Sequence, residues 1–540
     1  VPVGLNLVEA IHHIGKEVPH YCYHSKLSVS GNCRMCLVET GLPLRDRATG
    51  APVLENGKSK IGWQPKPVIA CATTVSPGLH VRLDSPVVKG CREGITEFLL
   101  LNHPLDCPIC DQAGECKLQE YSADYGRGFS RYSDDKNRKP KKVRLGPRVM
   151  LDNERCILCS RCIRFCREIS KNPVLGFINR GSRSQLACFP GQELADNYSL
   201  NTVDVCPVGA LTSTDFRFKM RVWFLKRTPG ICPESSVGVN TVIWSREGKI
   251  YRITPRRNDA VNDTWMPDSG RILYKSVTAP DRLSEPARAD AQEKAASLLA
   301  AGATAYVVSG HMSVEEQAIA AELVKAAPGP VWLPRHAGEN DGLLLSEDRT
   351  PNTRGALLTG LVDHLPDPGL TALAEKLERG EIKTLLVFGE DITLNGIAAG
   401  VLSRSGVKII YAGTHANATS ALAEVVLPGL TVFEKDGTFV NEQFRLQKFS
   451  QAVPGPAGVP PGIETLSGLL ARVRGIPVDT VATVDAVWQR LGAAPGPLHG
   501  IAFGGIPGEG ILIDGSAWSH LAFSETKSLH YAPHPAPGHE

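Results

Sequence analysis

The chain has 540 residues, more than a single hydrophobic core can serve, so we expect about three to five domains. Its 59 basic and 56 acidic side chains nearly balance, which argues against a nucleic-acid-binding protein, because phosphate contacts need a concentrated basic surface. No stretch approaches the ~20 apolar residues that cross a bilayer, and the N-terminal sequence has neither the cationic region nor the long apolar run of a secretory signal. Any membrane link should therefore come through partner proteins.

The 15 cysteines are the most informative residues of the chain. All of them lie at or before Cys232, and most fall in closely spaced groups. An odd number in such groups is not the pattern of a secreted disulfide framework. It indicates metal ligation in a reducing compartment.

The first group of cysteines follows a short predicted helix. Residues 1–4 resemble the end of a strand, so the native start is expected upstream. Residues 5–15 predict a helix, because four positions recur at helical spacing: Leu5, Val8, Ile11 and His12. The group after it has one cysteine, a C-x₂-C pair and a distant cysteine: Cys22, Cys33, Cys36 and Cys71. This form resembles a plant-type [2Fe–2S] ferredoxin with altered spacing, although four cysteines also suit zinc.

The second group follows a longer predicted helix. Residues 84–102 begin with Asp84 or Ser85 as a helix cap, carry Pro86 in the first turn and have an apolar face. The helix leads into a set of one histidine and three cysteines: His103, Cys107, Cys110 and Cys116. In isolation such a set suits tetrahedral zinc. With a cluster set on either side, it favours a [4Fe–4S] cluster that has one imidazole ligand.

The third group follows a polar stretch, residues 119–150, which we expect to be a surface excursion. Its basic run at 136–144 indicates a solvated loop or a subunit contact. The group itself has C-x₂-C-x₂-C and a remote C-P: Cys156, Cys159, Cys162 and Cys206. This is a strong [4Fe–4S] signature, and although Cys166 competes for the fourth place, the marker proline follows Cys206. Four cysteines remain, which we expect to be ordinary buried thiols: Cys91, Cys166, Cys188 and Cys232.

From about Thr304 onward, short β-branched runs alternate with helical stretches. Three of the runs end at Gly310, Gly389 and Gly413, and this alternation predicts a parallel α/β sheet with any ligand at the carboxyl ends of its strands. No complete G-x-G-x-x-G occurs, so the pattern gives little support to a dinucleotide site. Residues 453–462 form a Pro/Gly linker, and the tail at 530–540 is expected to be disordered or to lie over a partner.

The order of the three cysteine sets, with LLLNHPLDCPICDQAGEC in the middle, resembles the large iron–sulfur subunit of NADH:quinone oxidoreductase, respiratory complex I. The resemblance is close over residues 1 to about 275. Beyond that it is looser, and EKDGTFVNEQFRLQ at 434–447 is the best match to the molybdopterin-oxidoreductase-like domain of the family. His103 and the cysteines of the three sets fall on the ligand pattern of that family.

The resemblance implies a multidomain α+β and α/β fold in five parts. These are a plant-type [2Fe–2S] ferredoxin-like β-grasp domain (1–77), a His–Cys₃ [4Fe–4S] domain (78–118), a [4Fe–4S] ferredoxin-like domain (119–218), a degenerate molybdopterin-oxidoreductase iron–sulfur segment (219–275) and a degenerate molybdopterin-oxidoreductase-like α/β domain with a C-terminal tail (276–540). It implies an electron-transfer subunit with one [2Fe–2S] cluster, two [4Fe–4S] clusters and no catalytic centre of its own.

By the same resemblance, the partners would be the NADH- and FMN-binding flavoprotein subunit, a ferredoxin-like subunit with two [4Fe–4S] clusters and other peripheral-arm subunits of complex I. Electrons would pass from the flavoprotein through this chain toward quinone. The expected location is the cytoplasmic face of the bacterial inner membrane, or the matrix side of the membrane in a mitochondrion.

The chain departs from the family pattern in two places. Some members bind a further cluster with C-x₂-C-x₃-C and a later cysteine, but after Cys232 the corresponding positions are Ser235, Val239 and Pro267, so we expect that cluster to be absent. No cysteine follows Cys232 to bind molybdenum, so we expect no molybdopterin and a structural role for the last domain. The alternatives are a catalytic molybdopterin enzyme such as formate dehydrogenase, the diaphorase or accessory segment of a hydrogenase, and a zinc-stapled scaffold.

Overall fold

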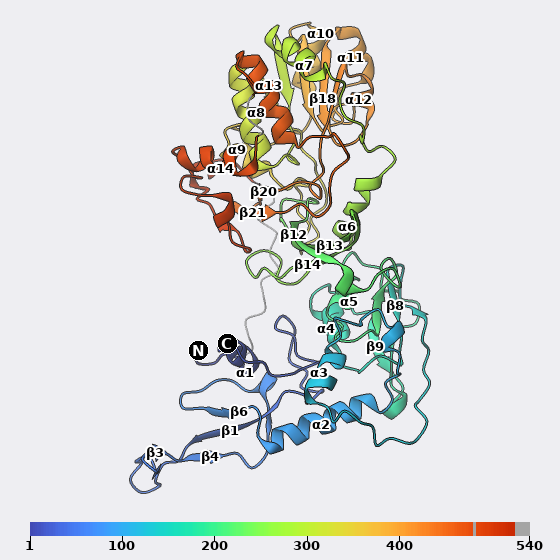
Figure 1. Cartoon of the computed structure of the whole chain (residues 1–540), viewed down its shortest axis with the longest axis vertical. Helices are drawn as coiled ribbons and strands as arrows, with labels where there is room; N and C mark the ends of the chain where they lie inside the picture. Colours follow the sequence, from blue (N-terminus) through green and yellow to red (C-terminus); the bar gives the residue numbers. More distant parts are fainter. Residues whose placement is uncertain (479–481, 524–540) are drawn as a thin grey trace. The chain divides into compact units, whose positions relative to one another are not determined.

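The computed structural model describes residues 1–478 and 482–523 (Figure 1). It divides into two compact units, unit 1 at Val1–Leu225 and unit 2 from Lys226 onward. The division lies a few residues after the boundary that the sequence placed between 218 and 219. The tail at 530–540 lies outside the described residues. Within the described ranges, no helix combines the length and the apolar character needed to span a membrane.

Unit 1 begins with a small antiparallel sheet and a helix that packs on it. The central strand β1 pairs with three others, and the strands are β1 (Leu37–Pro43), β4 (Ile61–Trp63), β5 (Val68–Ile69) and β6 (His80–Arg82). A hairpin, β2 (Leu54–Glu55) and β3 (Lys58–Ser59), extends from it. Helix α1 (Leu7–His13) buries Val8 and Ile11 in the same core as Val38. This confirms the helix predicted at 5–15.

The first four residues do not form the strand that the sequence suggested. The Gly4 N–H instead donates to the Val75 carbonyl at 2.9 Å, and the nearest bridge joins Asn6 to Thr74. Apart from this bond, residues 1–4 form no ladder of hydrogen bonds with a neighbouring strand. The prediction was wrong because the apolar residues at 1–3 were counted without a partner for them.

Two helices connect the sheet to the remainder of unit 1. Helix α2 (Pro86–Leu100) starts at Ser85, whose side chain accepts a hydrogen bond from the Val88 N–H, as the predicted cap requires. Helix α3 (Lys117–Tyr125) packs against α2 and occupies part of the stretch expected to be a surface excursion. That expectation was wrong there, because Leu118 and Tyr121 form a buried stripe three residues apart that a count of polar residues hides.

The rest of unit 1 holds the third cysteine group. A three-stranded antiparallel sheet contains β7 (Val143–Arg144), β8 (Val149–Leu151) and β11 (Leu211–Ser213), and a separate hairpin contains β9 (Leu175–Ile178) and β10 (Gln185–Cys188). Two helices lie among these strands, α4 (Arg161–Glu168) and α5 (Asn201–Asp204).

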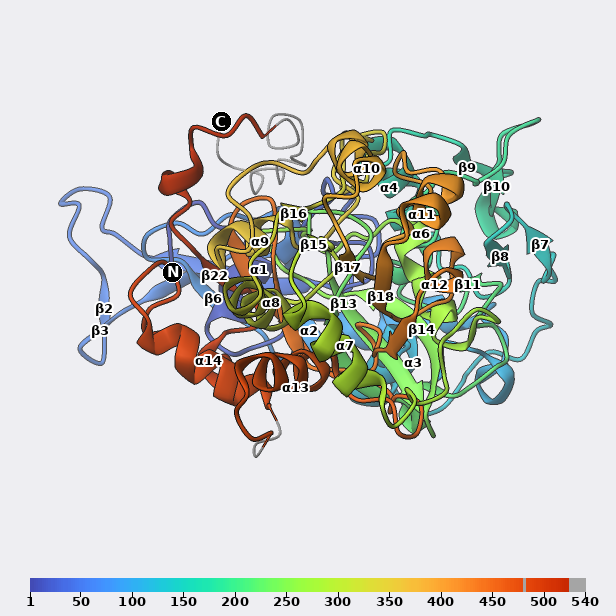
Figure 2. The ribbon, with the colours of Figure 1, turned by 90° about the horizontal axis from the view of Figure 1, so that it is seen from above.

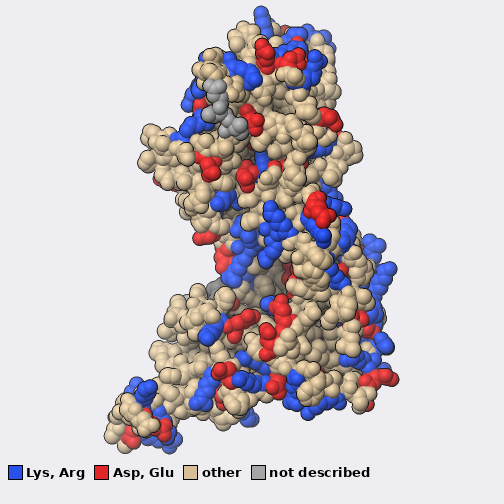
Figure 3. All heavy atoms as spheres, in the orientation of Figure 1, with Lys and Arg blue, Asp and Glu red and all other residues tan. Residues whose placement is uncertain are grey.

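Unit 2 opens with an antiparallel sheet of three long strands, β12 (Lys226–Ile231), β13 (Asn240–Arg246) and β14 (Lys249–Pro255). In the space-filling view, Lys and Arg side chains gather over this sheet (Figure 3). Two of them stack on one aromatic ring, since the guanidinium groups of Arg227 and Arg252 lie 5.1 and 4.4 Å from the centre of Trp244. Stacking on the ring lets the sheet expose charge while it buries the stems of the side chains. The helix α6 (Asp268–Arg271) follows.

The main body of unit 2 is a parallel sheet covered on both faces. Its order is β16 (Val331–Trp332), β15 (Thr304–Val307), β17 (Thr384–Phe388), β18 (Lys408–Gly413) and β19 (Val425–Pro428), and every pair is parallel. One face packs on α7 (Ala291–Ala300), α8 (Val314–Ala326) and α13 (Gly462–Arg474), and the other on α10 (Thr371–Glu378) and α11 (Ala399–Ser405) (Figure 2). The predicted alternation is therefore confirmed.

A smaller antiparallel sheet completes unit 2. Its strands are β20 (Gly437–Val440), β21 (Arg445–Phe449) and β22 (Ile511–Leu512), and α9 (Thr353–Leu358) packs on β20. Two further helices of unit 2 are α12 (Ala418–Ala421) and α14 (Val484–Ala493). The stretch at 434–447 lies in and beside β20 and β21. Its Glu434 forms a buried ion pair with Arg282 at 2.7 Å, which ties this sheet to the start of the α/β domain.

Candidate metal centres

The four thiols of the first set lie together beneath the N-terminal sheet. The Cys22 sulfur shares hydrogen bonds with those of Cys33 and Cys71, and Cys36 shares one with Cys71. Bonding to Cys33 and Cys71 lowers the pKa of Cys22, while bonding to Cys22 raises the pKa of Cys33 and Cys71. Asn6 fixes one side of the set, because its side chain caps α1 and also donates to the Cys71 carbonyl at 2.5 Å.

The third set is organised by a strained loop before α4. Leu158 and Ser160, which separate its ligand cysteines, both have positive φ, 57° and 62°, a conformation that non-glycine residues rarely adopt. This backbone directs N–H groups at sulfur: the Leu158 N–H lies 3.4 Å from the Cys156 sulfur. Such bonds stabilise negative charge on a sulfur ligand.

One cavity collects the thiols of the third set: Cys156, Cys159, Cys162 and Cys206. Burial raises the pKa of Cys156 and of Cys206 to about 12, so these sulfurs stay protonated at neutral pH unless a metal replaces the protons. Cys166 does not line this cavity, and burial together with Asp196 and Cys188 raises its pKa.

The second set spreads over a loop between α2 and α3. Cys107 begins a short helical turn, Cys116 caps α3, and Arg221 donates to the Cys110 carbonyl at 2.5 Å. His103 lies just after α2, where burial, and then Arg155 and Lys136, lower its pKa to about 4. Its imidazole is therefore neutral at pH 7, the form in which histidine binds a metal. Whether its ring completes this set stays a prediction.

Cationic side chains surround the second set. Asp106, next to Cys107, pairs with Lys141 at 2.8 Å and with the buried Arg155 at 3.0 Å. The charge of Arg155 also acts on the Cys110 thiol. A thiolate-ligated cluster carries negative charge, so these cations would stabilise it where few water molecules can.

Two arginines join the first set to the third. Arg164 on α4, only 4% exposed, donates from one Nη2 to the carbonyls of Cys22, at 2.5 Å, and of Cys159, at 3.4 Å. Arg161 on the same helix donates to the carbonyls of Tyr23 and Val205. Each arginine thus donates to a carbonyl in a ligand loop of the first set and to a carbonyl in a ligand loop of the third set.

A different contact joins the third set to the second. Gly209 lies three residues after Cys206, and a Cβ atom placed there would lie 2.2 Å from the Cys110 sulfur. In addition, the Lys117 N–H donates to the Pro207 carbonyl at 3.0 Å. Only glycine lets the two loops approach so closely.

Tyr21 lies between the first set and the second. Its ring is fully buried and packs edge-on against Tyr121, with 5.4 Å between ring centres. Burial, and then the neighbouring thiols of Cys116 and Cys33, raise its pKa. Among the described residues the hydroxyl oxygen has no hydrogen-bond partner, although buried hydroxyls nearly always have one. A sulfur-ligated cluster on either side would supply the missing acceptor.

Sequence reasoning did not identify these linking residues. Arg161 and Arg164 both lie within CSRCIRFC, but arginine among cysteines has no distinctive spacing. The contacts of Arg164 reach from residue 164 back to Cys22, and only the fold brings those loops together. Gly209 could have been noticed as the glycine that follows the C-P signature.

Cys232 belongs to none of the three sets and directly follows the first strand of unit 2. It is 5% exposed, and its N–H donates to the Val239 carbonyl at 2.8 Å. Ser235 and Val239, the positions where some family members have thiolates, are also buried. Of the other three leftover thiols, Cys166 is buried as expected, whereas Cys91 and Cys188 are partly exposed, which corrects the expectation for them.

The donor chemistry of the three sets fits iron–sulfur clusters. Across the described ranges, no three His, Cys, Asp or Glu side chains are arranged to hold a single metal ion. In a cluster the ligands bind different irons, so they need not converge on one point. Iron–sulfur clusters are bound by soft sulfur donors and stabilised by hydrogen-bond donors and positive charge around the sulfurs. The sites offer all of these, with the N–H groups that face the sulfurs, the Tyr21 hydroxyl and the nearby cations.

Family models match four separate segments of the chain. Residues 92–131 match the NADH-ubiquinone oxidoreductase-G iron–sulfur binding region, and residues 146–212 match the ferredoxin-like domain of NADH-quinone oxidoreductase subunit 3. Residues 225–275 match the NADH-ubiquinone oxidoreductase NDSU1/NuoG-like 4Fe-4S domain, and residues 295–462 match molybdopterin oxidoreductase. The mixed, multidomain fold class predicted from the sequence is thereby confirmed.

Curated relatives match about half of the chain. The G-type subunit of the NADH-quinone oxidoreductase of Rickettsia prowazekii is 42% identical over 283 residues, which is 52% of this chain and 38% of the relative. The mitochondrial NADH dehydrogenase [ubiquinone] iron–sulfur protein 1 of Solanum tuberosum is 40% identical over 53% of this chain and 36% of its own length. The resemblance to the large iron–sulfur subunit is confirmed over that half, and the aligned part spans under two fifths of each relative.

A solved structure of an NAD⁺-reducing [NiFe]-hydrogenase in the H₂-reduced state aligns with 41% of this chain and 86% of its own chain, at 25% identity and a TM-score of 0.32. A similarity of that size carries no structural argument.

Proposed function

We propose that the chain is the electron-carrying iron–sulfur subunit of an NADH:quinone oxidoreductase, and that it holds one [2Fe–2S] cluster and two [4Fe–4S] clusters. The ligands would be Cys22, Cys33, Cys36 and Cys71 for the first, His103, Cys107, Cys110 and Cys116 for the second, and Cys156, Cys159, Cys162 and Cys206 for the third. When bound, such clusters accept and donate one electron at a time.

The observation that carries the proposal is that single residues touch two cysteine sets at once. Arg164 bonds the loops of the first and third sets, and Gly209 places the third set against the second. Isolated structural zinc sites would need no such neighbours. Electron carriers need short, fixed gaps, because transfer between sites weakens steeply as their separation grows.

We place this chain between two partners of the kind that the family implies. A flavoprotein that oxidises NADH would deliver electrons, and a ferredoxin-like subunit would remove them toward quinone. The same proposal includes the domain divisions at 77, 118, 218 and 275. It also includes a location on the peripheral arm, at the cytoplasmic or matrix side of the membrane. The role of this chain is to hold the clusters, exclude water and adjust their potentials through N–H bonds and burial.

Metal content gives the direct test. Protein purified anaerobically should contain about ten irons and no stoichiometric zinc, for one [2Fe–2S] and two [4Fe–4S] clusters. Iron and zinc are measured by plasma emission, and the clusters by low-temperature EPR of the reduced protein. Iron near fourteen would mean that the region of Cys232 holds a further cluster, and stoichiometric zinc in place of iron would contradict the electron-transfer role.

Tyr21→Phe should lower the reduction potential of the first or second cluster by about 40 mV. The reason is that one hydrogen bond to a cluster, worth about 1 kcal/mol, favours the more negative reduced state. Redox titration followed by EPR measures this shift. Tyr125→Phe is the matched control, because Tyr125 lies at the end of α3 and is partly exposed. Unchanged potentials for both clusters in Tyr21→Phe would show that the hydroxyl bonds neither.

A further inference from the structure

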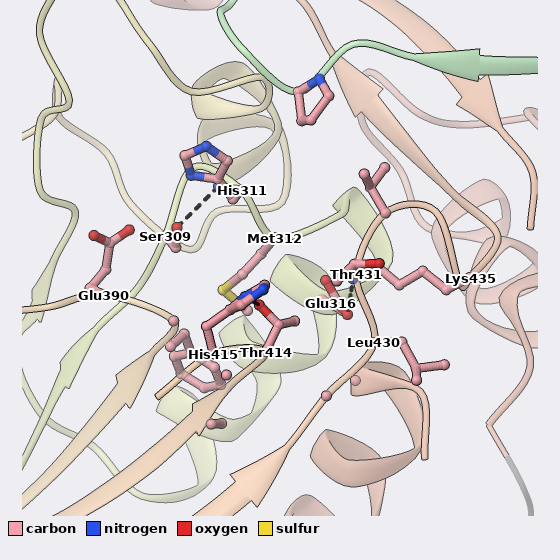
Figure 4. Close-up of a pocket in the computed structure, with 18 of the residues that line it drawn as sticks. Ser309, His311, Met312, Glu316, Glu390, Thr414, His415, Leu430, Thr431 and Lys435 are labelled. Carbon is pink, nitrogen blue, oxygen red and sulfur yellow. Dashed lines mark hydrogen bonds and ion pairs between the residues drawn. The ribbon is translucent and has the colours of Figure 1, made fainter. Parts of the chain in front are cut away.

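A cavity of about 560 Å³ lies in unit 2 at the carboxyl ends of the parallel strands. Its wall includes Ser309 and His311 after β15, Glu390 after β17, Thr414 after β18 and Thr431 after β19 (Figure 4). This is the edge of the sheet where open α/β folds bind ligands. The volume lies within the ~300–1,000 Å³ range of sites for small molecules.

His311 offers a free imidazole ring to this cavity. Two buried atoms of the wall, Glu234 Oε2 and Thr465 Oγ1, also have no hydrogen-bond partner among the described residues. Figure 4 shows the His311 ring above the space that Met312 and Glu390 also border, and the ring packs edge-on against that of His336, with 5.7 Å between ring centres. His311 is exposed to the cavity, but many protein atoms surround its ring, and this burial lowers the pKa of the imidazole to about 4. Both properties fit a ring in the wall of a recess. Only its backbone N–H forms a hydrogen bond among the described residues, to the Ser309 hydroxyl at 3.1 Å. The neutral ring therefore keeps one donor and one acceptor for a ligand.

Most charged groups in the wall already have partners; the exception is the buried Oε2 atom of Glu234, a carboxyl whose pKa is raised by burial. Lys435 pairs with Glu316 at 2.5 Å, and the Nε2 atom of His336 bonds Glu390 at 2.7 Å, which raises the pKa of His336. Arg349 donates to the carbonyl of Glu339 at 2.6 Å. Lys435 is therefore occupied, Arg349 is held through one Nη2 atom by a neutral carbonyl, and the wall carboxylates, Glu234 among them, would repel a polyanion such as a pterin dinucleotide.

The remaining wall is largely apolar. It contains three aromatic rings and several aliphatic side chains, among them Phe388, Phe433, Phe439, Met312 and Leu466. Apolar walls with one or two placed polar groups bind ligands by burying carbon surface and orient them by a hydrogen bond. The free groups thus select for a ligand with a mainly apolar body and a neutral polar edge.

We propose that this cavity binds an uncharged, mainly apolar organic molecule that carries an amide or a nitrogen heterocycle, and that His311 recognises that polar edge. The site differs in chemistry from the phosphate-binding site expected of a molybdopterin enzyme. It also goes beyond the electron-carrying role, which uses residues of unit 1 alone.

The test uses the full chain with its clusters and two probes of the same shape, 2-naphthamide and 2-naphthoate, followed by ligand-observed saturation-transfer NMR. The amide should bind saturably, and the carboxylate and inorganic pyrophosphate should not. His311→Phe keeps the bulk and should weaken amide binding about tenfold, the share of one hydrogen bond. His311→Gln restores a donor and an acceptor and should recover most of the affinity.

His499→Phe is the matched control, because His499 is exposed and lies outside the cavity wall. EPR spectra of the clusters and the melting temperature show that each variant is folded. The proposal is overturned if the amide fails to bind saturably, if His311→Phe binds it as well as the unaltered chain does, or if naphthoate or pyrophosphate binds more tightly.

Discussion

Cys206→Ala should abolish the third cluster, whereas Cys166→Ala should leave it in place. The Cys206 sulfur lines the same cavity as Cys156, Cys159 and Cys162, and N–H groups of Val208 and Leu211 face it. The signal of this cluster in the EPR spectrum should vanish in Cys206→Ala, with the loss of about four irons per chain.

Cys166→Ala is the matched control for this prediction. Cys166 is fully buried and lies on α4 one turn beyond the ligand candidate Cys162, so its removal tests the loss of a neighbouring thiol that does not line the cavity. Its neighbours are Asp196 and Cys188 rather than the thiols of the cavity wall. Loss of the signal in Cys166→Ala alone would reverse the ligand assignment.

His103→Ala should remove the second cluster or convert it to a form with fewer irons, and His103→Cys should keep it at a lower potential. A fourth thiolate adds one negative charge, and at ~4 Å and an effective permittivity of ~20 a unit charge contributes about 4 kcal/mol, so the fall should be on the order of 100 mV after screening. Redox titration of the EPR signal measures it.

Substitution of a histidine outside the three sets controls for the general effect of removing an imidazole. His80→Ala is suitable, because His80 is exposed on β6 and belongs to none of the three sets. An unchanged second-cluster spectrum in His103→Ala would exclude His103 as a ligand.

Much of the fold could be predicted from the sequence, because its signals are local. The cap at Ser85 and the alternation after Thr304 each depend on residues within one element, and both were confirmed. The grouping of thiols in the third set also follows from spacing, since C-x₂-C-x₂-C leaves few ways to arrange three sulfurs. Their role as ligands stays a prediction.

The features that spacing could not predict depend on contacts between distant segments. The partners of Arg164 are 142 and 5 residues away, and only one of those separations is visible to a local pattern. Helix α3 was missed because the tyrosine that it buries was counted as polar. The cavity beside His311 forms where four parallel strands end. The sequence predicts that edge of the sheet as the place for a ligand, but it does not predict which side chains there lack a hydrogen-bond partner.

The arginine that spans two ligand loops has a consequence for both sets. Because one guanidinium holds the carbonyls of Cys22 and Cys159, a displacement of α4 would move both ligand loops at once. A substitution that unwinds α4 should therefore weaken the first and the third sets together.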